Sequence, residues 1–250
     1  MTLPEAFLDR PFAHRGLHDV TDGRPENSVE AINAAIAAGY GIEIDIQPSH
    51  DGTAMVFHDY DMERLAGTKG PIAMRPTDAL AQTVLLGGAT GVPTLPDVLK
   101  LVRGRVPLLI EIKDQDGALG ENVGPLEHAV ADALDGYSGD VALMSFNPHS
   151  IAEIQTLCPD RPRGLVTCAY TQEDWPVVPR EVRERLAGIP DYDRVGACFV
   201  SHDRSDLANP AVSLLKARGA KVLTWTIKSH VQETVARRIV DNITFEQYLA

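Results

Sequence analysis

Short apolar runs recur along the whole chain, and between them apolar residues are spaced three and four positions apart. The runs are typical of buried strands, and the wider spacing is typical of amphipathic helices. Strands are predicted at residues 12–15, 42–46, 54–57, 108–113, 141–146, 164–167, 197–201, 222–227 and 239–243. Helices are predicted at residues 28–38, 95–102, 126–134, 150–157, 180–186, 211–217 and 230–237. Strands and helices that alternate in this way indicate repeated βα units and a parallel sheet.

The helix at residues 28–38 has signals at both ends. Asn27 is a suitable N-cap, and Glu30 three residues later completes the pattern of a capping box. Gly39 follows the last apolar positions and is expected to end the helix in a left-handed conformation. The sequence therefore predicts a helix with defined boundaries soon after the first strand.

The repeated βα units are compatible with a closed barrel or with an open, doubly wound sheet. The Gly-rich fingerprints of nucleotide-binding open sheets, GxGxxG and GxxxxGK[ST], do not occur in the sequence. The chain has 250 residues, which is typical of one eight-stranded α/β barrel. We therefore expect a single domain over residues 1–250 with the fold of a (β/α)₈ TIM barrel.

Residues 60–92, which come soon after His58, interrupt this alternation. They are rich in Gly, Pro and Thr and contain a short apolar patch at residues 84–86. Two interpretations remain open. The segment is either an excursion over the mouth of the barrel that walls a substrate pocket, or a mobile surface loop.

The overall charge narrows the choice of partner. The formal net charge of −12 argues against a nucleic acid or an anionic membrane surface, but a small anionic substrate is compatible if the site carries its own cations. No apolar stretch approaches the roughly 20 residues that span a bilayer, and no signal peptide is visible. The three cysteines lack metal-ligand spacing, so we expect reduced thiols and a cytoplasmic location. The sequence carries no signal for an oligomeric state.

Acidic residues occur inside two of the predicted strands. Glu43 and Asp45 alternate with isoleucines in one strand, and Glu111 and Lys113 stand on either side of Ile112 in the other. Side chains two positions apart on a strand share a face, so each pair points in one direction. Buried carboxylates that lie side by side are costly unless a cation or a proton offsets them. Three inward carboxylates without a cysteine or a His-x-His pair suit one hard divalent cation, Mg²⁺ or Ca²⁺. The alternative is a structural ion network in which these acids pair with Arg15 and Lys113.

Two histidines, His14 and His58, stand at the ends of predicted strands. Taken alone, each is most simply a packed core histidine. Beside an acidic cluster they are interpreted as general acid and base, because imidazole titrates near neutral pH. Arg15 and Lys113 then face an anion, and a guanidinium can grip a phosphate with two hydrogen bonds. A metal and two cationic side chains around an anion indicate phosphoryl chemistry.

Eight short motifs follow one another in the order and spacing of a known family. They are His14-Arg15-Gly16, Pro25-Glu26-Asn27-Ser28, Glu43-Ile44-Asp45, His58-Asp59, Pro93-Thr94-Leu95-Pro96, Glu111-Ile112-Lys113, Ser145-Phe146 and Trp225-Thr226. Through this ordered set the chain resembles the glycerophosphodiester phosphodiesterases over nearly its whole length. The resemblance implies a (β/α)₈ barrel of the phosphatidylinositol phospholipase C-like type. It also implies a divalent metal and hydrolysis of glycerophosphodiesters to an alcohol and sn-glycerol 3-phosphate.

The resemblance also implies roles for individual residues. The metal ligands would be Glu43, Asp45 and Glu111, the acid/base pair His14 and His58, and the phosphate contacts Arg15 and Lys113. Family enzymes are thought to let the glycerol hydroxyl of the substrate attack first, which gives a cyclic phosphate that water then opens.

Three further residues have two possible roles each. The resemblance places Glu26 near the site, on the metal or the glycerol, whereas an acid beside a helix N-terminus is also favoured by the helix dipole. Phe146 and Trp225, at or near strand ends, either line the pocket or belong to the core. The family commonly has a Gly-Ile-x-Thr-Asp pattern in its last strand, which residues 238–246 of this chain do not contain. The rim that the last strand would contribute is therefore not predicted.

Two other functions are weighed against hydrolysis. A lyase of the sphingomyelinase D or phosphatidylinositol phospholipase type would release a cyclic phosphate, but the apolar or basic surface that a lipid substrate favours is not evident in the sequence. A catalytically silent barrel would only bind a phosphodiester or a metal, and loss of one histidine or acid would indicate it. Because the set is complete, the prediction is a phosphoric diester hydrolase that acts on a small-molecule glycerophosphodiester.

Overall fold

Parallel strands form the central sheet of the protein. The computed structural model describes residues 1–250. The parallel strands are β1 (Phe12–Ala13), β2 (Gly41–Pro48), β4 (Leu108–Ile112), β5 (Val141–Ser145), β6 (Arg163–Thr167), β7 (Phe199–Asp203), β8 (Lys221–Ile227) and β9 (Asn242–Phe245). They are hydrogen-bonded in the order β1-β9-β8-β7-β6-β5-β4-β2, and β1 also pairs with β2, so the sheet closes on itself. Helices occur between the strands, which confirms the predicted (β/α)₈ barrel.

All seven predicted helices are present, and six shorter ones accompany them. The predicted ones are α2 (Val29–Ala38), α5 (Leu95–Val102), α6 (Pro125–Leu134), α7 (Pro148–Leu157), α8 (Arg180–Ala187), α9 (Pro210–Ala217) and α10 (His230–Ala236). The others are α1 (Ala6–Asp9), α3 (Glu63–Ala66), α4 (Thr77–Gln82) and the 3₁₀ turns η1 (Val20–Asp22), η2 (Ile72–Met74) and η3 (Arg204–Asp206).

The prediction for the last strand was displaced along the chain. It was expected at residues 239–243, but β9 begins at Asn242. The side-chain amide of Asn242 donates to the carbonyl oxygens of Phe7 and Arg10, at 2.8 and 2.7 Å. A buried polar side chain with these partners is as suited to a strand as an apolar one. The apolar pair Ile239 and Val240 led the prediction to begin before Asn242, where the strand starts.

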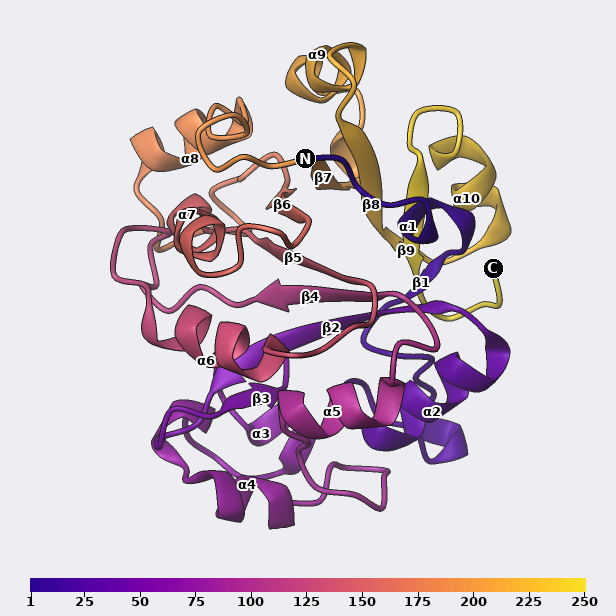
Figure 1. Cartoon of the computed structure of the whole chain (residues 1–250), viewed down its shortest axis with the longest axis vertical. Coiled ribbons are helices and arrows are strands. Elements are labelled where there is room, and N and C mark those ends of the chain that lie inside the picture. Colours follow the sequence, from indigo (N-terminus) through magenta and orange to yellow (C-terminus); the bar gives the residue numbers. More distant parts are fainter. The chain divides into compact units, whose positions relative to one another are not determined.

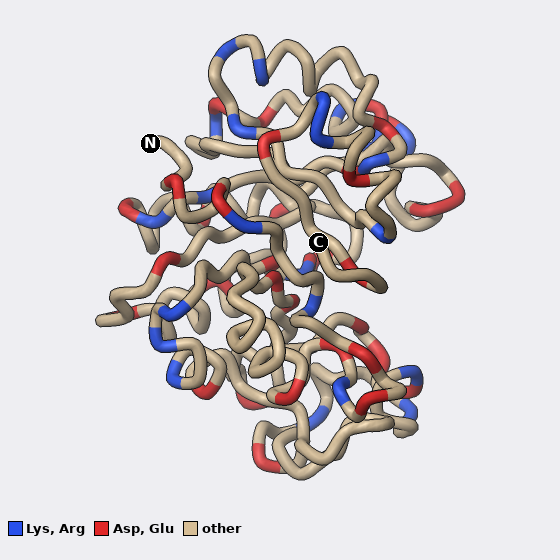
Figure 2. Tube along the Cα trace, turned by 90° about the vertical axis from the view of Figure 1, so that its right-hand side faces the viewer, with Lys and Arg blue, Asp and Glu red and all other residues tan.

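The chain divides into two compact units. Unit 1 contains residues 1–11, 114–124 and 142–250, and unit 2 contains residues 12–113 and 125–141. Unit 2 carries β1 to β4 and α2 to α6, and unit 1 carries α1 and the elements from β5 onward. Figure 2 shows acidic and basic residues interspersed along the chain in both units. None of the helices combines the length and the hydropathy that crossing a bilayer requires.

In unit 2, β2 is the strand that organises the sheet. It pairs in parallel with β1 on one side and β4 on the other, and at its far end in antiparallel with the short β3 (Ala54–Val56). All but its last residue are buried, as expected for a strand covered on both faces. Gly41 is the register partner of Phe12, and a Cβ there would lie 2.7 Å from the Phe12 ring. The strand therefore begins with the one residue that leaves space for this ring.

The N-terminus of α2 differs from the prediction by one residue. Ser28, not Asn27, is the N-cap, and its hydroxyl accepts from the backbone N–H of Ala31. The prediction of a capping box was also wrong, because the Asn27 backbone N–H donates to the Arg15 carbonyl oxygen. The Glu30 carboxylate accepts from the Ala89 N–H and the Thr90 hydroxyl. The shift frees the Asn27 side chain for a contact in the site.

Residues 60–92 fold around an apolar core of their own. The segment contains α3, η2 and α4, which lie beside β3 in unit 2 (Figure 1). Met62, Leu65, Ile72, Leu80, Leu85 and Val92 pack together with Met55 and Phe57 and are almost completely buried. We call residues 60–92 the excursion. Because its core includes residues of β3 and the segment after it, α3 is held at the side of the sheet where His58 follows β3.

Candidate active site

Three carboxylates meet on one face of the β2–β4 pair. Asp45 is the register partner of Glu111, and Glu43 lies two residues before Asp45 on β2. All three residues are buried, with exposed fractions between 1% and 8%. Their carboxylate oxygens lie within 4.8 Å of one another. The parallel pairing therefore joins two separate sequence motifs into one buried acidic cluster of Glu43, Asp45 and Glu111.

Two cationic side chains contact this acidic cluster. The Lys113 ammonium donates to Glu111 Oε1 at 2.8 Å and lies 3.2 Å from Asp45 Oδ1. Arg15 Nε lies 3.3 Å from Asp45 Oδ2, and the Arg15 backbone N–H donates to Glu43 Oε2 at 3.0 Å. Burial favours the neutral form of Lys113, but Glu111 and Asp45 outweigh it and raise the pKa of Lys113. Both cations therefore remain charged in the site.

Glu43 and Asp45 respond to this environment in opposite directions. Burial, together with the charges of Asp45 and Glu111, raises the pKa of Glu43 well above its usual range. Burial also disfavours the charged form of Asp45, but the charges of Lys113, His58 and Arg15 lower the pKa of Asp45 far below its usual range. The acidic cluster thus has more negative charge than its neighbours neutralise, and without a further cation Glu43 favours a proton.

The donor set of the acidic cluster fits a hard divalent cation. Its ligand atoms are all carboxylate oxygens, which Mg²⁺ and Ca²⁺ prefer, and no sulfur or imidazole belongs to it. Zn²⁺ sites normally recruit thiolate or imidazole ligands. A divalent cation would also offset the negative charge of Glu43, which the neighbouring side chains leave uncompensated.

The loop after β1 carries His14, Arg15 and Gly16. Arg15 has a left-handed backbone, with φ of 55°, which directs its N–H toward Glu43. Gly16 is also left-handed, with φ of 78°, and a Cβ there would lie 2.9 Å from the backbone of Ala31 in α2. The glycine thus permits the loop to approach α2 closely, and this approach presents Arg15 to the acidic cluster.

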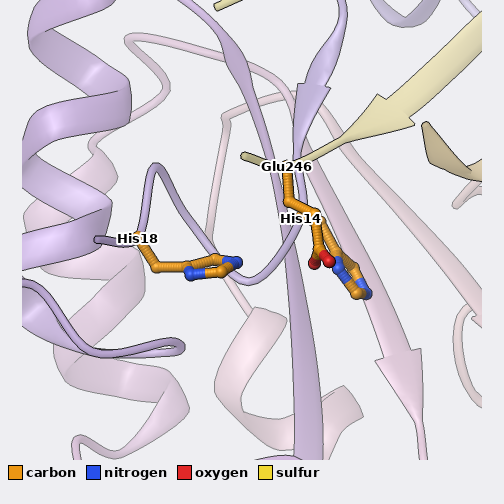
Figure 3. A group of neighbouring side chains, drawn as sticks. All are labelled: His14, His18 and Glu246. Carbon is orange, nitrogen blue, oxygen red and sulfur yellow. The ribbon is translucent and has the colours of Figure 1, made fainter. Parts of the chain in front are cut away.

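His14 has a second histidine near it. Figure 3 shows the side chains of His14, directly after β1, and His18, farther along the same loop. A ring nitrogen of His14 lies within 4.8 Å of a ring nitrogen of His18. The loop position of His18 carried no sequence signal for this proximity. Figure 3 also labels Glu246 of unit 1, which follows β9 and lies 2.8 Å from the Lys228 ammonium of that unit.

His58 follows β3 and is held by two neighbours. Its Nδ1 lies 2.7 Å from Asp59 Oδ1. The buried Gln47 amide, on β2, donates to the His58 carbonyl oxygen at 3.1 Å. Although partial burial acts in the opposite direction, hydrogen bonds from His58 and Arg64 keep the pKa of Asp59 well below its usual range. Asp59 is therefore an anionic acceptor, and it selects the tautomer of His58 that carries its proton on Nδ1.

Glu26 lies between two arginines. Its Oε1 accepts from Arg15 at 2.6 Å, and its two oxygens accept from Arg64, on α3, at 2.8 and 2.9 Å. Burial disfavours the charge on Glu26, but Arg64 and Arg15 together lower its pKa. Glu26 is therefore ionised and is held at the site by both guanidinium groups.

Asn27 is a functional candidate that sequence reasoning assigned elsewhere. It is fully buried, and its amide donates to Asp45 Oδ2 at 2.9 Å and accepts from the Asp45 backbone N–H at 3.3 Å. Its backbone is left-handed, with φ of 59°. The signal was present in the Pro25-Glu26-Asn27-Ser28 motif, because Ser28 is an equally good N-cap and leaves Asn27 available.

Phe146 and Trp225 belong to unit 1, where they form an aromatic cluster with Tyr170 and Trp175. The Phe146 ring lies 4.9 Å from the ring of Trp175 and 5.6 Å from that of Trp225, between ring centroids. The Trp225 indole N–H donates to the Ser201 carbonyl oxygen. Both predicted residues are thus partly buried against an apolar cluster, and their role in lining a substrate pocket stays a prediction.

Known glycerophosphodiester phosphodiesterases are similar to this chain in sequence and in fold. The model of the glycerophosphoryl diester phosphodiesterase family matches residues 14–247. A glycerophosphodiester phosphodiesterase of Caldanaerobacter subterraneus subsp. tengcongensis is 25% identical over 92% of this chain and 91% of its own length. One of Bacillus altitudinis is 29% identical over 64% of this chain and 67% of its own.

The structural comparison agrees with the sequence comparison. A phosphodiesterase of Oleispira antarctica, solved in complex with the product sn-glycerol-3-phosphate, superposes with a TM-score of 0.76 at 25% identity and covers 97% of this chain and 94% of its own. The glycerophosphodiester phosphodiesterase of Thermotoga maritima superposes with a TM-score of 0.70 at 21% identity, over 94% of this chain and 92% of its own. The chain belongs to the glycerophosphoryl diester phosphodiesterase family.

Proposed function

We propose that this protein hydrolyses glycerophosphodiesters to sn-glycerol 3-phosphate and an alcohol, with one bound Mg²⁺ or Ca²⁺. The observation that supports this most strongly is the buried acidic cluster with Lys113 and Arg15 against it. The acidic cluster and its neighbours together place five carboxylates against three fixed cations. The carboxylates are those of Glu26, Glu43, Asp45, Asp59 and Glu111, and the cations are those of Arg15, Arg64 and Lys113. The excess of negative charge matches one divalent cation.

The protein's own side chains then have distinct tasks. Glu43, Asp45 and Glu111 would hold the metal, which when bound stabilises negative charge on the phosphate. Arg15 and Lys113 add positive charge at the same place and orient the phosphate. Glu26, held by Arg15, would keep that guanidinium in place.

Proton transfer is assigned to the two histidines. Because Asp59 holds the Nδ1 proton of His58, Nε2 is the ring atom that accepts or donates a proton during the reaction. His14, which follows β1 directly, is assigned the complementary transfer at the other oxygen of the phosphodiester. In this assignment one imidazole deprotonates the attacking oxygen and the other protonates the leaving oxygen.

An assay with glycerophosphocholine tests the proposal. We expect release of sn-glycerol 3-phosphate that stops with EDTA and returns when Mg²⁺ or Ca²⁺ is restored. His14→Ala and His58→Ala should each lower kcat by about 10²–10⁴-fold without loss of folding, as removal of a general acid or base does. The assignment is wrong if there is no turnover with any divalent metal. A cyclic phosphate as the final product would identify a lyase instead.

A further inference from the structure

The excursion places one arginine, Arg64, against two site carboxylates at once. Arg64 Nε and one terminal nitrogen donate to the two oxygens of Asp59, both at 2.7 Å. Its terminal nitrogens also donate to the two oxygens of Glu26, at 2.8 and 2.9 Å. All three nitrogens of the guanidinium are therefore engaged, and each carboxylate is held through both of its oxygens.

We propose that Arg64 is a positioning residue, which acts on His58 through Asp59. The inference rests on the proposed function, because it takes His58 as a group that transfers protons. Asp59 Oδ1 accepts from Arg64 and also lies 2.7 Å from His58 Nδ1. A carboxylate held in this bidentate way cannot rotate about its own bonds without breaking both contacts to Arg64. The imidazole plane of His58, and the direction of its Nε2, are fixed in consequence.

The contacts of Arg64 with Glu26 hold the guanidinium in place. Glu26 is 13% exposed and is also bound by Arg15, so it is a fixed point on the loop before α2. Arg64 itself is carried by α3, whose Leu65 is buried in the core of the excursion. Because both carboxylates are already fixed and the guanidinium is planar and rigid, little conformational freedom is lost when Arg64 binds them. This is why a half-exposed side chain can still set the geometry of His58.

The geometry also distinguishes Arg64 from an ordinary surface ion pair on the same segment. Lys69 lies 3.6 Å from Glu63 with its side chain 84% exposed, so it makes a single contact in solvent. Such pairs hold no particular geometry. Lys69→Ala removes one positive charge from the excursion, as Arg64→Ala does, and leaves Asp59 and Glu26 untouched. It is the matched control for charge.

The test compares kcat and KM for the wild type, Arg64→Ala, Arg64→Lys and Lys69→Ala on glycerophosphocholine with the metal present. We expect Arg64→Ala to lower kcat by about 10–100-fold, the usual effect of removing a residue that holds a site residue's hydrogen-bond partner, with KM changed less than about twofold. Arg64→Lys keeps the charge but not the planar fork, so it should stay impaired. Lys69→Ala should match the wild type. Guanidinium ion added to Arg64→Ala should restore part of kcat.

The route through Asp59 is tested by a double variant. If Arg64 acts on His58 only through Asp59, Arg64→Ala combined with Asp59→Asn should be no slower than the slower single variant. Losses of kcat that add in the double variant would overturn the inference. It would also be overturned if Arg64→Ala raised KM instead of lowering kcat and Glu26→Gln raised KM to the same extent. A wild-type kcat in Arg64→Ala would overturn it as well. Thermal unfolding of each variant separates loss of folding from loss of turnover, and rescue by guanidinium occurs only in a folded protein.

The two proposals fail in different ways. An inactive wild type, or a His58→Ala variant with unchanged kcat, contradicts the proposed function and leaves no proton transfer for Arg64 to serve. An active wild type with an inactive His58→Ala and an unimpaired Arg64→Ala contradicts only the role of Arg64.

Discussion

At the scale of single residues, the site is built from buried charges whose partners decide their chemistry. Glu43 and Asp45 lie two positions apart on one strand, yet the pKa of one is raised and that of the other is lowered. Asp45 has Lys113 and Arg15 as cationic neighbours, and Asn27 donates to it as well. Glu43 accepts a backbone N–H from Arg15. A bound divalent cation would act most strongly on Glu43, whose charge has the least compensation.

Removal of the Asn27 side chain should weaken metal binding. Asn27→Gly keeps the left-handed backbone but deletes the amide that orients Asp45. Loss of a side chain that hydrogen-bonds a metal-ligating carboxylate typically costs about 10–100-fold in metal affinity. Titration of activity with Mg²⁺ and with Ca²⁺ gives the affinity. The matched control is Asn33→Ala, which truncates an exposed asparagine on α2 and should bind metal as the wild type does. Unchanged affinity in Asn27→Gly would show that Asp45 is oriented without it.

At the scale of elements, the strands were predictable and the short helices were not. β2 and β4 are apolar runs interrupted by acids at alternate positions, so the sequence indicated both the strands and the face that the acids share. Helices α3 and α4 have four and six residues, too few for periodicity to detect. They depend on the core of the excursion, which no local pattern specifies. Arg64 was missed for the same reason.

The boundary of α2 shows the limit of prediction for side-chain roles. Asn27 and Ser28 are both good N-caps, and local propensity does not choose between them. The choice is made by the buried Asp45, which lies 18 positions later and binds the Asn27 amide. His58, by contrast, was indicated by the sequence as a site residue because it stands with Asp59 just after a short strand, and its role as an acid or base stays a prediction.

The close approach of the β1 loop to α2 leads to a stability prediction. Gly16→Ala introduces a Cβ 2.9 Å from the backbone of Ala31 at a position with φ of 78°. Gly52 has φ of 83° and nothing within 4 Å of a Cβ, so Gly52→Ala isolates the backbone cost, about 1–2 kcal/mol. Overpacking adds about 1–3 kcal/mol in Gly16→Ala. Denaturant unfolding measures both variants. Equal losses would mean that the loop moves away from α2 freely.

At the scale of the whole molecule, the formal charge of −12 and a site for an anionic substrate are compatible. Much of the acid near the site is balanced locally by Arg15, Arg64 and Lys113, and a divalent cation would complete the balance. The site's cations are therefore supplied by particular positions, and net charge carries no information about them. Family membership supports the phosphodiester chemistry that we propose for this local arrangement.

The response of the whole chain to acid should depend on a histidine outside the acidic cluster. His202 on β7 is fully buried in unit 1, where Nδ1 lies 2.7 Å from the Thr167 hydroxyl and Nε2 lies 3.2 Å from Asp206 Oδ2. Burial lowers the pKa of His202 despite the charge of Asp206. In the unfolded chain a histidine has a pKa of about 6.5, so near and below that pH the unfolded chain binds more protons than the folded chain. The stability that neutral His202 contributes is present above about pH 6.5 and is lost as the pH falls toward its folded pKa.

Denaturant unfolding between pH 5.5 and 7.5 checks this sign, with the pH range set by the ordinary histidine pKa of about 6.5. The free energy of unfolding of the wild type should fall as the pH is lowered through this range. His202→Gln removes the titrating group, so the difference in stability between wild type and variant should shrink toward the acidic end. His128→Asn, which replaces an exposed histidine on α6, should retain the wild-type slope. A difference between wild type and His202→Gln that stays constant with pH would mean that His202 does not gain a proton on unfolding. The acid sensitivity of the chain would then originate in its other titrating groups, the carboxylates and the remaining histidines, because these also gain protons as the pH falls.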